Sequence, residues 1–375
     1  MYLQEILYAL LAFPVLALFV TVPYVLHQYK KYGAIPFIRV VIVYSFILYL
    51  LVAFFLVMLP LPSQEFVNNL TTPWVQLIPF SFIKDIITQV PLTWNFYKYQ
   101  EVYQVLFNIV LTIPFGVYLR YYFKCNLKKT ILWTFLLSLF FELTQLSGLY
   151  FIYSRPYRLF DVDDLMLNTL GGLIGYAVTK VFTFWLPTRD EIEEDSYEKG
   201  MKVSTTKRLT ALILDYIYII LLHMPLSIIP VLFKIKLNGT QLTIIVLLIY
   251  YVLIPTIKKG YTWGKKTCNL KIVDVSGNDC KWYQYLIRYF MLYFFIWGFP
   301  KLFELVVGST IKVTDIWPKE YLFALYVVYL TSLVLILLFI FINNVIKKKP
   351  FLYEKISKTK LVSTIKIPEE YLDEE

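Results

Sequence analysis

Long apolar runs are the feature that most constrains this chain. Runs of 18 or more mostly apolar residues recur along its 375 residues, and a run of that length can cross the hydrocarbon core of a bilayer as a helix. The composition agrees, because 58% of the residues are apolar and 17% are charged, whereas soluble domains have roughly 45–50% and about 25%. We therefore expect an all-α, polytopic integral membrane protein.

The runs predict about nine transmembrane helices in two modules. We expect a five-span module over residues 1–186, a polar cytoplasmic linker over 187–207, a four-span module over 208–362 and a disordered acidic tail over 363–375. The expected spans lie near residues 5–27, 38–59, 101–121, 130–150, 164–186, 210–233, 241–257, 284–306 and 320–345.

Basic residues indicate the orientation in the membrane. The loops after the first, third and seventh spans, the 187–207 linker and the segment after Asn344 are rich in Lys and Arg. Cytoplasmic loops carry such an excess, so we expect the N-terminus outside and the C-terminus in the cytoplasm. We attribute the net charge of +10 to this bias and to contact with anionic membrane lipids, and we expect no nucleic-acid binding.

The cysteines and histidines do not predict a metal site. Cys125, Cys268 and Cys280 form no C-x-x-C pair, and His27 and His223 are far apart in the sequence. In the expected orientation all three thiols face the cytoplasm, where thiols stay reduced. We expect neither a metal ion nor another cofactor.

The segment RPYRLFDVDDLMLNTLGG, residues 155–172, places five charges at the mouth of the fifth span. Asp161 can cap this helix, and each acid in its first turn is favoured by about 0.3–1 kcal/mol. Capping accounts for one or two acids, but not for three acids beside two arginines. Further along, Gly171 and Gly175 have the spacing that lets a neighbouring helix approach closely.

Polar residues continue into three of the expected helices. A carboxylate inside the bilayer, such as that of Glu142, costs about 2.5–3.5 kcal/mol on insertion scales, so it needs a partner or a water-filled cavity. Arg155 or Arg158 is the expected partner. We expect a polar pocket open to the outer membrane surface, and the alternative is that the same groups only hold the helices together. The expected pocket residues are Asn108, Glu142, Gln145, Arg155, Arg158, Asp161, Asp164 and Asn168.

These motifs resemble the VanZ-like family. The ordered set is NIVLTIPFG at 108–116, ELTQ at 142–145 and RLFDVDDLMLNTLGGLIG at 158–175, and the resemblance covers roughly residues 35–186. Named members are associated with low-level resistance to lipoglycopeptides such as teicoplanin. The resemblance implies a bacterial membrane protein of the cell envelope whose shared polar positions are Asn108, Glu142, Gln145, Arg158, Asp161, Asp164 and Asn168.

The second module carries charged positions of its own. Arg208 and Asp215 are seven residues apart on one face of the sixth span, about 10 Å along the helix axis. A buried Asp215 needs a cation, which Arg208 or Arg288 could supply, and both a structural ion pair and a functional site remain open. In the loop that follows, LKIVDV predicts a short strand and SGND at 276–279 predicts a hairpin turn.

This second pattern resembles the RDD family over about residues 204–362. The family has an R-x-x-A-x-x-x-D helix, a glycine- and lysine-containing loop and a later arginine. Its closing His-Asp box is replaced here by Tyr353-Glu354, which keeps a carboxylate but leaves the family's usual geometry open at this position. The resemblance implies no agreed activity, although ion transport has been suggested for some members. The signature positions are Arg208, Asp215, Gly264, Lys265, Asp274, Arg288 and Glu354.

Three functions are compatible with these patterns. In the first, the outer pocket binds a lipid-linked or amphiphilic ligand, such as a cell-wall precursor or a lipoglycopeptide, and changes antibiotic sensitivity. In the second, Asp215 and Glu142 serve an ion- or proton-coupled transporter. In the third, the D-x-D-D acids hold Mg²⁺ in an intramembrane enzyme acting on lipid carriers, which is less favoured because no Ser/His/Asp set, G-x-S-x-G or H-E-x-x-H motif is present.

Overall fold

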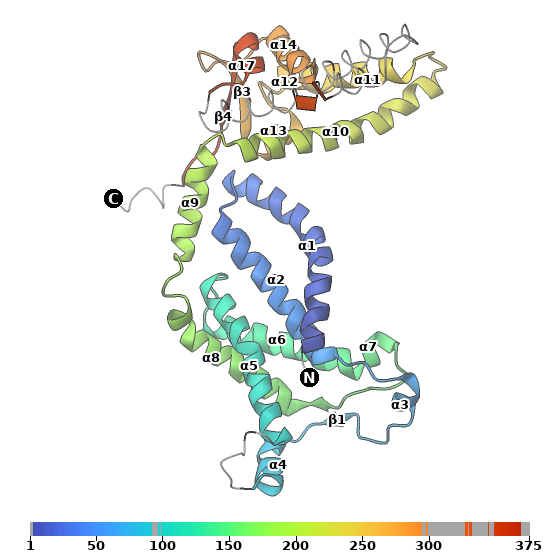
Figure 1. The fold of residues 1–375 in the computed structure, drawn as a ribbon, viewed down its shortest axis with the longest axis vertical. Coiled ribbons are helices and arrows are strands. Elements are labelled where there is room, and N and C mark those ends of the chain that lie inside the picture. The colour runs from blue at the N-terminus through green and yellow to red at the C-terminus, as the bar shows by residue number, and fades with distance from the viewer. Residues whose placement is uncertain are drawn as a thin grey trace. The chain divides into compact units, whose positions relative to one another are not determined.

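The computed structural model describes residues 3–91, 97, 99–294, 298, 327, 328, 330, 331, 344 and 349–368. Regular structure in these residues is almost entirely helical (Figure 1), and six helices are long and apolar enough to cross a membrane. This confirms a multi-pass helical membrane protein. The six are α1 (Leu3–Tyr32), α2 (Phe37–Met58), α5 (Gln100–Tyr121), α8 (Val162–Phe182), α10 (Thr205–Leu232) and the helix Gly239–Ile257.

Three of the nine expected spans are not among these six. The fourth corresponds to α6 (Leu127–Leu146), a 20-residue helix with two lysines in its first turn and Glu142 and Gln145 near its end. Of the eighth, mainly α14 (Trp282–Tyr293) is described, and the ninth, at 320–345, lies almost wholly outside the described residues. The count of nine remains a prediction.

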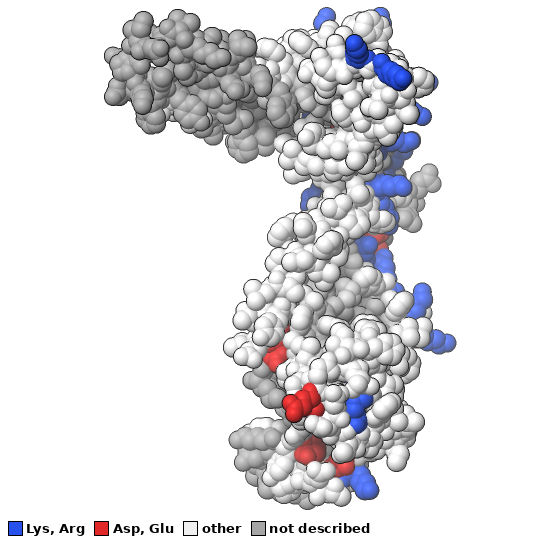
Figure 2. Space-filling model, turned by 90° about the vertical axis from the view of Figure 1, so that its right-hand side faces the viewer, with Lys and Arg blue, Asp and Glu red and all other residues white. Residues whose placement is uncertain are grey.

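The chain divides into two compact units. The first comprises Met1–Tyr24 and Pro36–Asp195, and the second comprises Val25–Ile35 and Ser196–Glu375. The end of α1 therefore groups with the second unit, where the Asn269 amide donates hydrogen bonds to the carbonyl oxygens of Tyr29 and Lys30 at 2.8 and 3.0 Å. On the face drawn in Figure 2, the acidic side chains in view lie mostly on the first unit, whereas the second unit shows mainly Lys and Arg.

The first unit is built on α5 and α8, which touch backbone to backbone. A Cβ on Gly171 would lie 2.2 Å from the Ile109 carbonyl oxygen, and one on Gly175 would lie 2.1 Å from that of Ile113. Only glycine permits this approach, so the prediction made from the spacing of Gly171 and Gly175 is confirmed. The shorter elements of the unit are α3 (Gln64–Asn68), α4 (Ser81–Gln89), α7 (Gly148–Phe151) and the parallel strand pair β1 (Val75–Gln76) and β2 (Phe160–Asp161).

Most of the segment expected as a polar linker, 187–207, is a helix, α9 (Arg189–Met201). Thr188 and Glu191 exchange side-chain-to-backbone hydrogen bonds of 3.2 Å in both directions, which is a capping box. An ion pair of 2.6 Å between Arg189 and Glu193 supports the first turns. The sequence of α9 has little apolar periodicity. Its cap and its charged pair, rather than an apolar face, therefore account for the start of the helix.

The second unit combines α10 and the helix Gly239–Ile257 with a small sheet. That helix consists of α11 (Gly239–Leu248), a π-helical turn η2 (Ile249–Leu253) and α12 (Ile254–Ile257). The predicted strand at LKIVDV is confirmed as β3 (Leu270–Asp274). β3 pairs in antiparallel fashion with β4 (Thr359–Ser363), which follows α17 (Leu352–Ser357) near the C-terminus. The first residue of the tail expected to be disordered, Ser363, therefore ends a strand, and residues 369–375 lie outside the described part.

Candidate functional site

Polar side chains of α5, α6 and α8 converge in the first unit. Asn108 of α5 donates a hydrogen bond to the carboxylate of Asp164 in the first turn of α8. Glu142 of α6 accepts a hydrogen bond of 3.0 Å from the backbone N–H of Asp161, at the same end of α8. Glu142 is only 3% exposed and is the most deeply buried of Asn108, Glu142 and Asp164.

A second layer of hydrogen bonds lies one turn further along α8. The Asn168 amide nitrogen donates to the Ser138 hydroxyl at 2.9 Å, and the Thr112 hydroxyl donates to the Asn168 carbonyl oxygen at 2.7 Å. The side-chain oxygen Oδ1 of Asn168 is buried and has no hydrogen-bond partner among the described residues. The three helices are therefore joined by polar contacts, and one acceptor is left over.

The two arginines of the expected pocket have different surroundings. Arg158 is exposed, donates to the Leu59 carbonyl oxygen at 3.0 Å and interacts electrostatically with Glu142 and Asp164. Arg155 instead donates to the carbonyl oxygens of Leu70 and Thr72 in the segment that follows α3. Of the two expected partners of Glu142, Arg158 lies near it and Arg155 anchors a loop.

The acids before and within the first turn of α8 have different roles. Asp161 caps α8 by accepting the backbone N–H of Asp163 at 2.9 Å, and its burial raises the pKa of its carboxyl. The carboxylate of Asp163 accepts the backbone N–H groups of Phe80 and Phe82 at 2.6 and 3.0 Å, which fixes the start of α4. Asp163 is thus a structural residue, whereas Asp161 and Asp164 remain half-buried beside Glu142.

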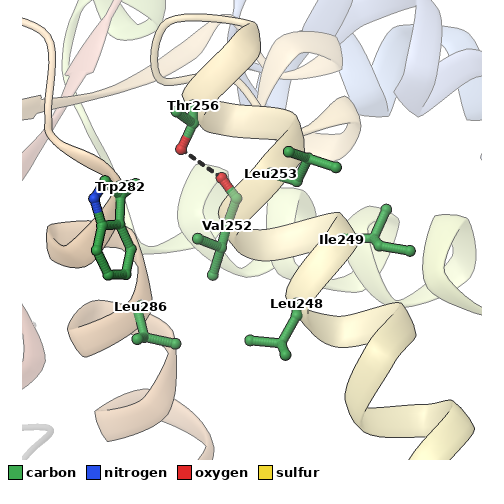
Figure 3. Close-up of a pocket in the computed structure, with 7 residues that line it drawn as sticks. All are labelled: Leu248, Ile249, Val252, Leu253, Thr256, Trp282 and Leu286. Carbon is green, nitrogen blue, oxygen red and sulfur yellow. Dashed lines mark hydrogen bonds between the residues drawn. The ribbon is translucent and has the colours of Figure 1, made fainter.

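Gln145 and the cavities lie apart from this cluster. The Gln145 amide donates to the Val57 carbonyl oxygen of α2 at 3.1 Å. One cavity of about 300 Å³ is lined by residues of α2, α5 and α8 near Pro114 and Thr183, and another of about 370 Å³ lies in the second unit (Figure 3). Neither cavity is lined by Asn108, Glu142 or Asp164. A ligand would therefore reach the cluster through its half-buried and exposed side chains, which are Asp161, Asp164 and Arg158.

In the second unit the side chain of Asp215 is fully buried. Its Oδ1 accepts hydrogen bonds from the Tyr250 hydroxyl at 2.7 Å, the Thr262 hydroxyl at 2.7 Å and the Gly264 N–H at 3.0 Å. Its Oδ2 accepts from the Lys265 ammonium at 2.6 Å. A buried carboxylate with one cation and three further donors is fully satisfied.

The partner of Asp215 is therefore Lys265, and not Arg208 or Arg288 as expected from the sequence. The loop after Ile257 folds into a short helix, α13 (Trp263–Thr267), whose cap is Thr262 and which carries Lys265 to Asp215. Burial alone would lower the pKa of Lys265, but the adjacent Asp215 carboxylate raises it above its usual range. The lysine in GYTWGK, residues 260–265, was the available sequence signal for this pair.

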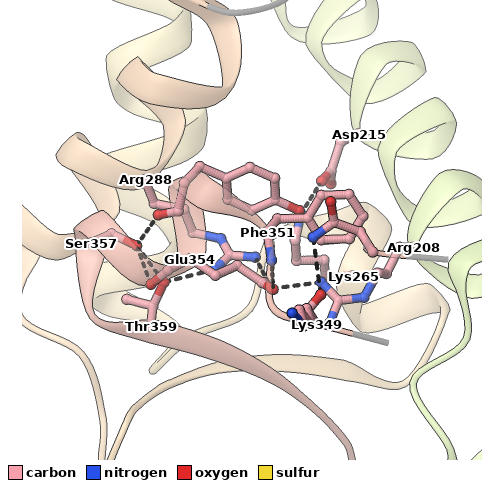
Figure 4. A network of polar contacts seen from close by, with 11 residues as sticks. Arg208, Asp215, Lys265, Arg288, Lys349, Phe351, Glu354, Ser357 and Thr359 are labelled. Carbon is pink, nitrogen blue, oxygen red and sulfur yellow. Dashed lines mark hydrogen bonds and ion pairs between the residues drawn. The ribbon is translucent and has the colours of Figure 1, made fainter. Parts of the chain in front are cut away.

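Arg208 and Arg288 meet at the carboxylate of Glu354 in α17. The Arg208 and Arg288 guanidinium groups lie 2.6 and 3.1 Å from the same oxygen of Glu354, and Arg288 also donates to the Thr359 hydroxyl at 2.7 Å (Figure 4). Asp274 lies apart at the end of β3, where its carboxylate accepts the Asn278 N–H at 2.8 Å within the turn. Within the described residues, no group of three or more His, Cys, Asp and Glu side chains could hold a metal ion.

Comparison with protein families matches two successive parts of the chain. The VanZ/LLP1 family matches residues 46–183, and the RDD family matches residues 202–350. No match was found among curated proteins or among solved structures. The chain is therefore a membrane protein that carries a VanZ-like domain followed by an RDD domain.

Proposed function

We propose that the VanZ-like domain binds the polar head of an amphiphile at the outer membrane surface and thereby changes the sensitivity of the bacterial envelope to lipoglycopeptides such as teicoplanin. The observation that carries the proposal is the meeting of Glu142, Asp164 and Arg158 at the N-terminal end of α8. Placing carboxylates and a guanidinium in a membrane domain costs free energy. Helix packing does not need these charged groups, so their presence together supports a ligand-binding role.

The arrangement fits a head group with both signs of charge. The exposed Arg158 can bind a phosphate or carboxylate through two parallel hydrogen bonds. The half-buried carboxylates of Asp161 and Asp164 can accept hydrogen bonds from an amine. A lipid-linked cell-wall precursor or a lipoglycopeptide offers such groups next to an apolar chain.

The proposal is tested by expressing the chain in a teicoplanin-sensitive bacterium and measuring the minimal inhibitory concentration. We expect the wild-type chain to raise this concentration and the double variant Glu142→Gln/Asp161→Asn to lose the effect. Glu65→Gln/Glu194→Gln is the matched control, because it removes two exposed acids of the same unit. Unchanged sensitivity with the wild-type chain, or full resistance in the double variant at equal expression, contradicts the proposal.

The variant Arg158→Gln distinguishes a ligand-binding role of the cluster from a purely structural role. Arg158 is exposed and its hydrogen bond goes to a single carbonyl oxygen, that of Leu59, so its loss should leave the melting temperature of the purified protein nearly unchanged. If the cluster binds a ligand, this variant loses the effect on teicoplanin while it keeps its stability. If the cluster only joins helices, the variant behaves as wild type in both measurements.

The two alternatives have less support. A transport role needs a carboxylate that can exchange protons or ions, whereas Asp215 is held by four donors and is fully buried. Proton or sodium flux in liposomes that disappears in Asp215→Asn would restore that role. A Mg²⁺ site on the D-x-D-D acids loses Asp163, because both of its oxygens accept backbone N–H groups.

A further inference from the structure

An apolar groove of about 370 Å³ runs beside the helix Gly239–Ile257 of the RDD domain (Figure 3). Its hydroxyl-bearing residue, Thr256, donates to the Val252 carbonyl oxygen at 2.6 Å, so this hydroxyl is already used by the helix backbone. Trp282 and Leu253 are 58% and 51% exposed, so the described residues leave the groove open at these two side chains. The walls are Leu248, Ile249, Val252 and Leu253 on one side and Trp282 and Leu286 of α14 on the other.

Positive charge lies at one end of this groove. Thr256 and Trp282 lie together at that end, while Leu248 and Leu286 lie at the other (Figure 3). The helix Gly239–Ile257 ends and α14 begins, at Trp282, at this end of the groove, and lysines flank both helix ends in the sequence. The flanking residues are the exposed Lys258, Lys259 and Lys281.

These lysines are available to a ligand. None of the three forms an ion pair with any residue that the structure describes. The nearest acid in the sequence, Asp279, is already paired with Lys271 at 2.8 Å. The end of the groove is therefore basic, while its walls are apolar.

We propose that the groove binds one acyl chain of an anionic phospholipid, with the lipid phosphate on Lys258, Lys259 and Lys281. The helix Gly239–Ile257 is long and apolar enough to cross a membrane, so its end at Ile257 lies at the level of the headgroups. Tryptophan is enriched at that level, and lysines there attract anionic lipids. An apolar wall that continues into a basic rim matches the two halves of such a lipid. The site is independent of the function proposed for the VanZ-like domain.

Native mass spectrometry of the full-length protein in detergent, with equimolar phosphatidylglycerol and phosphatidylcholine, tests the headgroup. We expect bound phosphatidylglycerol to survive at energies that remove phosphatidylcholine. Lys258→Gln/Lys259→Gln/Lys281→Gln should weaken phosphatidylglycerol binding about fivefold for each lysine. The matched control Lys199→Gln/Lys234→Gln/Lys236→Gln removes the same charge from exposed positions of the same unit and should bind as wild type.

A groove-filling variant tests the acyl chain. Val252→Phe should abolish selective phosphatidylglycerol retention with all lysines present, whereas Ile257→Phe, at a 65% exposed position outside the lining, should retain it. Soluble glycerol phosphate in excess should not displace the lipid, because it lacks the chain. Equal retention of both lipids, an effect of the control lysines as large as that of the groove lysines, or unchanged binding in a folded Val252→Phe variant overturns the proposal. Size-exclusion profiles and melting temperatures establish that each variant is folded.

Discussion

At the scale of single residues, the second unit contains two buried carboxylates whose cations come from distant parts of the chain. Asp215 is paired with Lys265, fifty residues later, and Glu354 is paired with Arg208 and Arg288. Such pairs contribute little net stability when complete, but they are costly to break, because the remaining charge stays buried without a partner. The sequence identified all five residues and assigned the partner of Asp215 incorrectly, since pairing depends on where the loop after Ile257 returns.

We expect Asp215→Asn to make folding stability rise with pH. Without the Asp215 carboxylate, burial lowers the folded-state pKa of Lys265 below its unfolded value of about 10.4, so the unfolded chain binds more protons than the folded one. The free energy of unfolding then increases as pH rises from the lowered folded-state pKa towards about 10.4, by about 1.4 kcal/mol in total for each pKa unit of that lowering. In the wild type the pKa of Lys265 is raised, so its contribution is constant in this range. Melting curves of the purified protein measure the difference.

The control for this pH effect is Asp215→Asn/Lys265→Met. It removes the titrating lysine, so its stability should follow the pH dependence of the wild type. Parallel pH curves for Asp215→Asn and the wild type would show that the ammonium of Lys265 finds another counterion when Asp215 is neutral.

Glu354→Ala should destabilise the protein by about 3–5 kcal/mol, because it leaves Arg208 and Arg288 without their shared carboxylate. Arg288→Ala should cost more than Arg208→Ala, since their side chains are 2% and 21% exposed and only Arg288 also binds Thr359. Denaturant titration measures these values. The neighbouring exposed Lys355→Ala should stay within about 0.5 kcal/mol of the wild type. Equal losses in the Lys355 and Glu354 variants would remove the ion triad as the cause.

At the scale of elements, the sequence predicts what local chemistry decides and misses what distant pairing decides. The apolar runs predicted the six helices that are long and apolar enough to cross a membrane, because a backbone in lipid must satisfy its hydrogen bonds within a helix. The start of α9 could also have been predicted, since Thr188-x-x-Glu191 is a capping box before a run of charges. The strand β4 could not, because Thr359–Ser363 becomes a strand only by pairing with β3, some ninety residues earlier.

The contact of α5 with α8 gives a prediction about glycine. Gly175→Ala should destabilise the first unit by about 1–3 kcal/mol. The added Cβ would lie 2.1 Å from the Ile113 backbone oxygen, so α5 and α8 would have to move apart. Gly239→Ala is the matched control, since no atom lies within 4 Å of a Cβ at that position. Hydrogen exchange of α5 and α8 and the melting temperature measure the effect. A Gly175→Ala variant as stable as Gly239→Ala would mean that α5 and α8 can move apart at little cost.

At the scale of the whole molecule, the polar cluster has its proposed function only if it faces outward. Basic loops predict that side, because Lys and Arg are retained in the cytoplasm, and they place Cys125 there as well. Cys125 is partly exposed, whereas Cys268 and Cys280 are buried, and burial raises the pKa of their thiols to about 12 and about 11. The thiolate is the reactive form of cysteine, so Cys125 should be the thiol that reacts at neutral pH.

A membrane-impermeant maleimide should therefore label the protein in inside-out vesicles and leave it unlabelled in intact cells. Cys125→Ser should remove the vesicle signal, since Cys268 and Cys280 stay protonated and buried. In that background, Thr71→Cys, at an exposed position of the segment between α3 and β1, should be labelled in intact cells. Labelling of Cys125 from outside would invert the orientation, and the carboxylates of Asp161 and Asp164 would then meet ligands of the cytoplasm rather than envelope antibiotics.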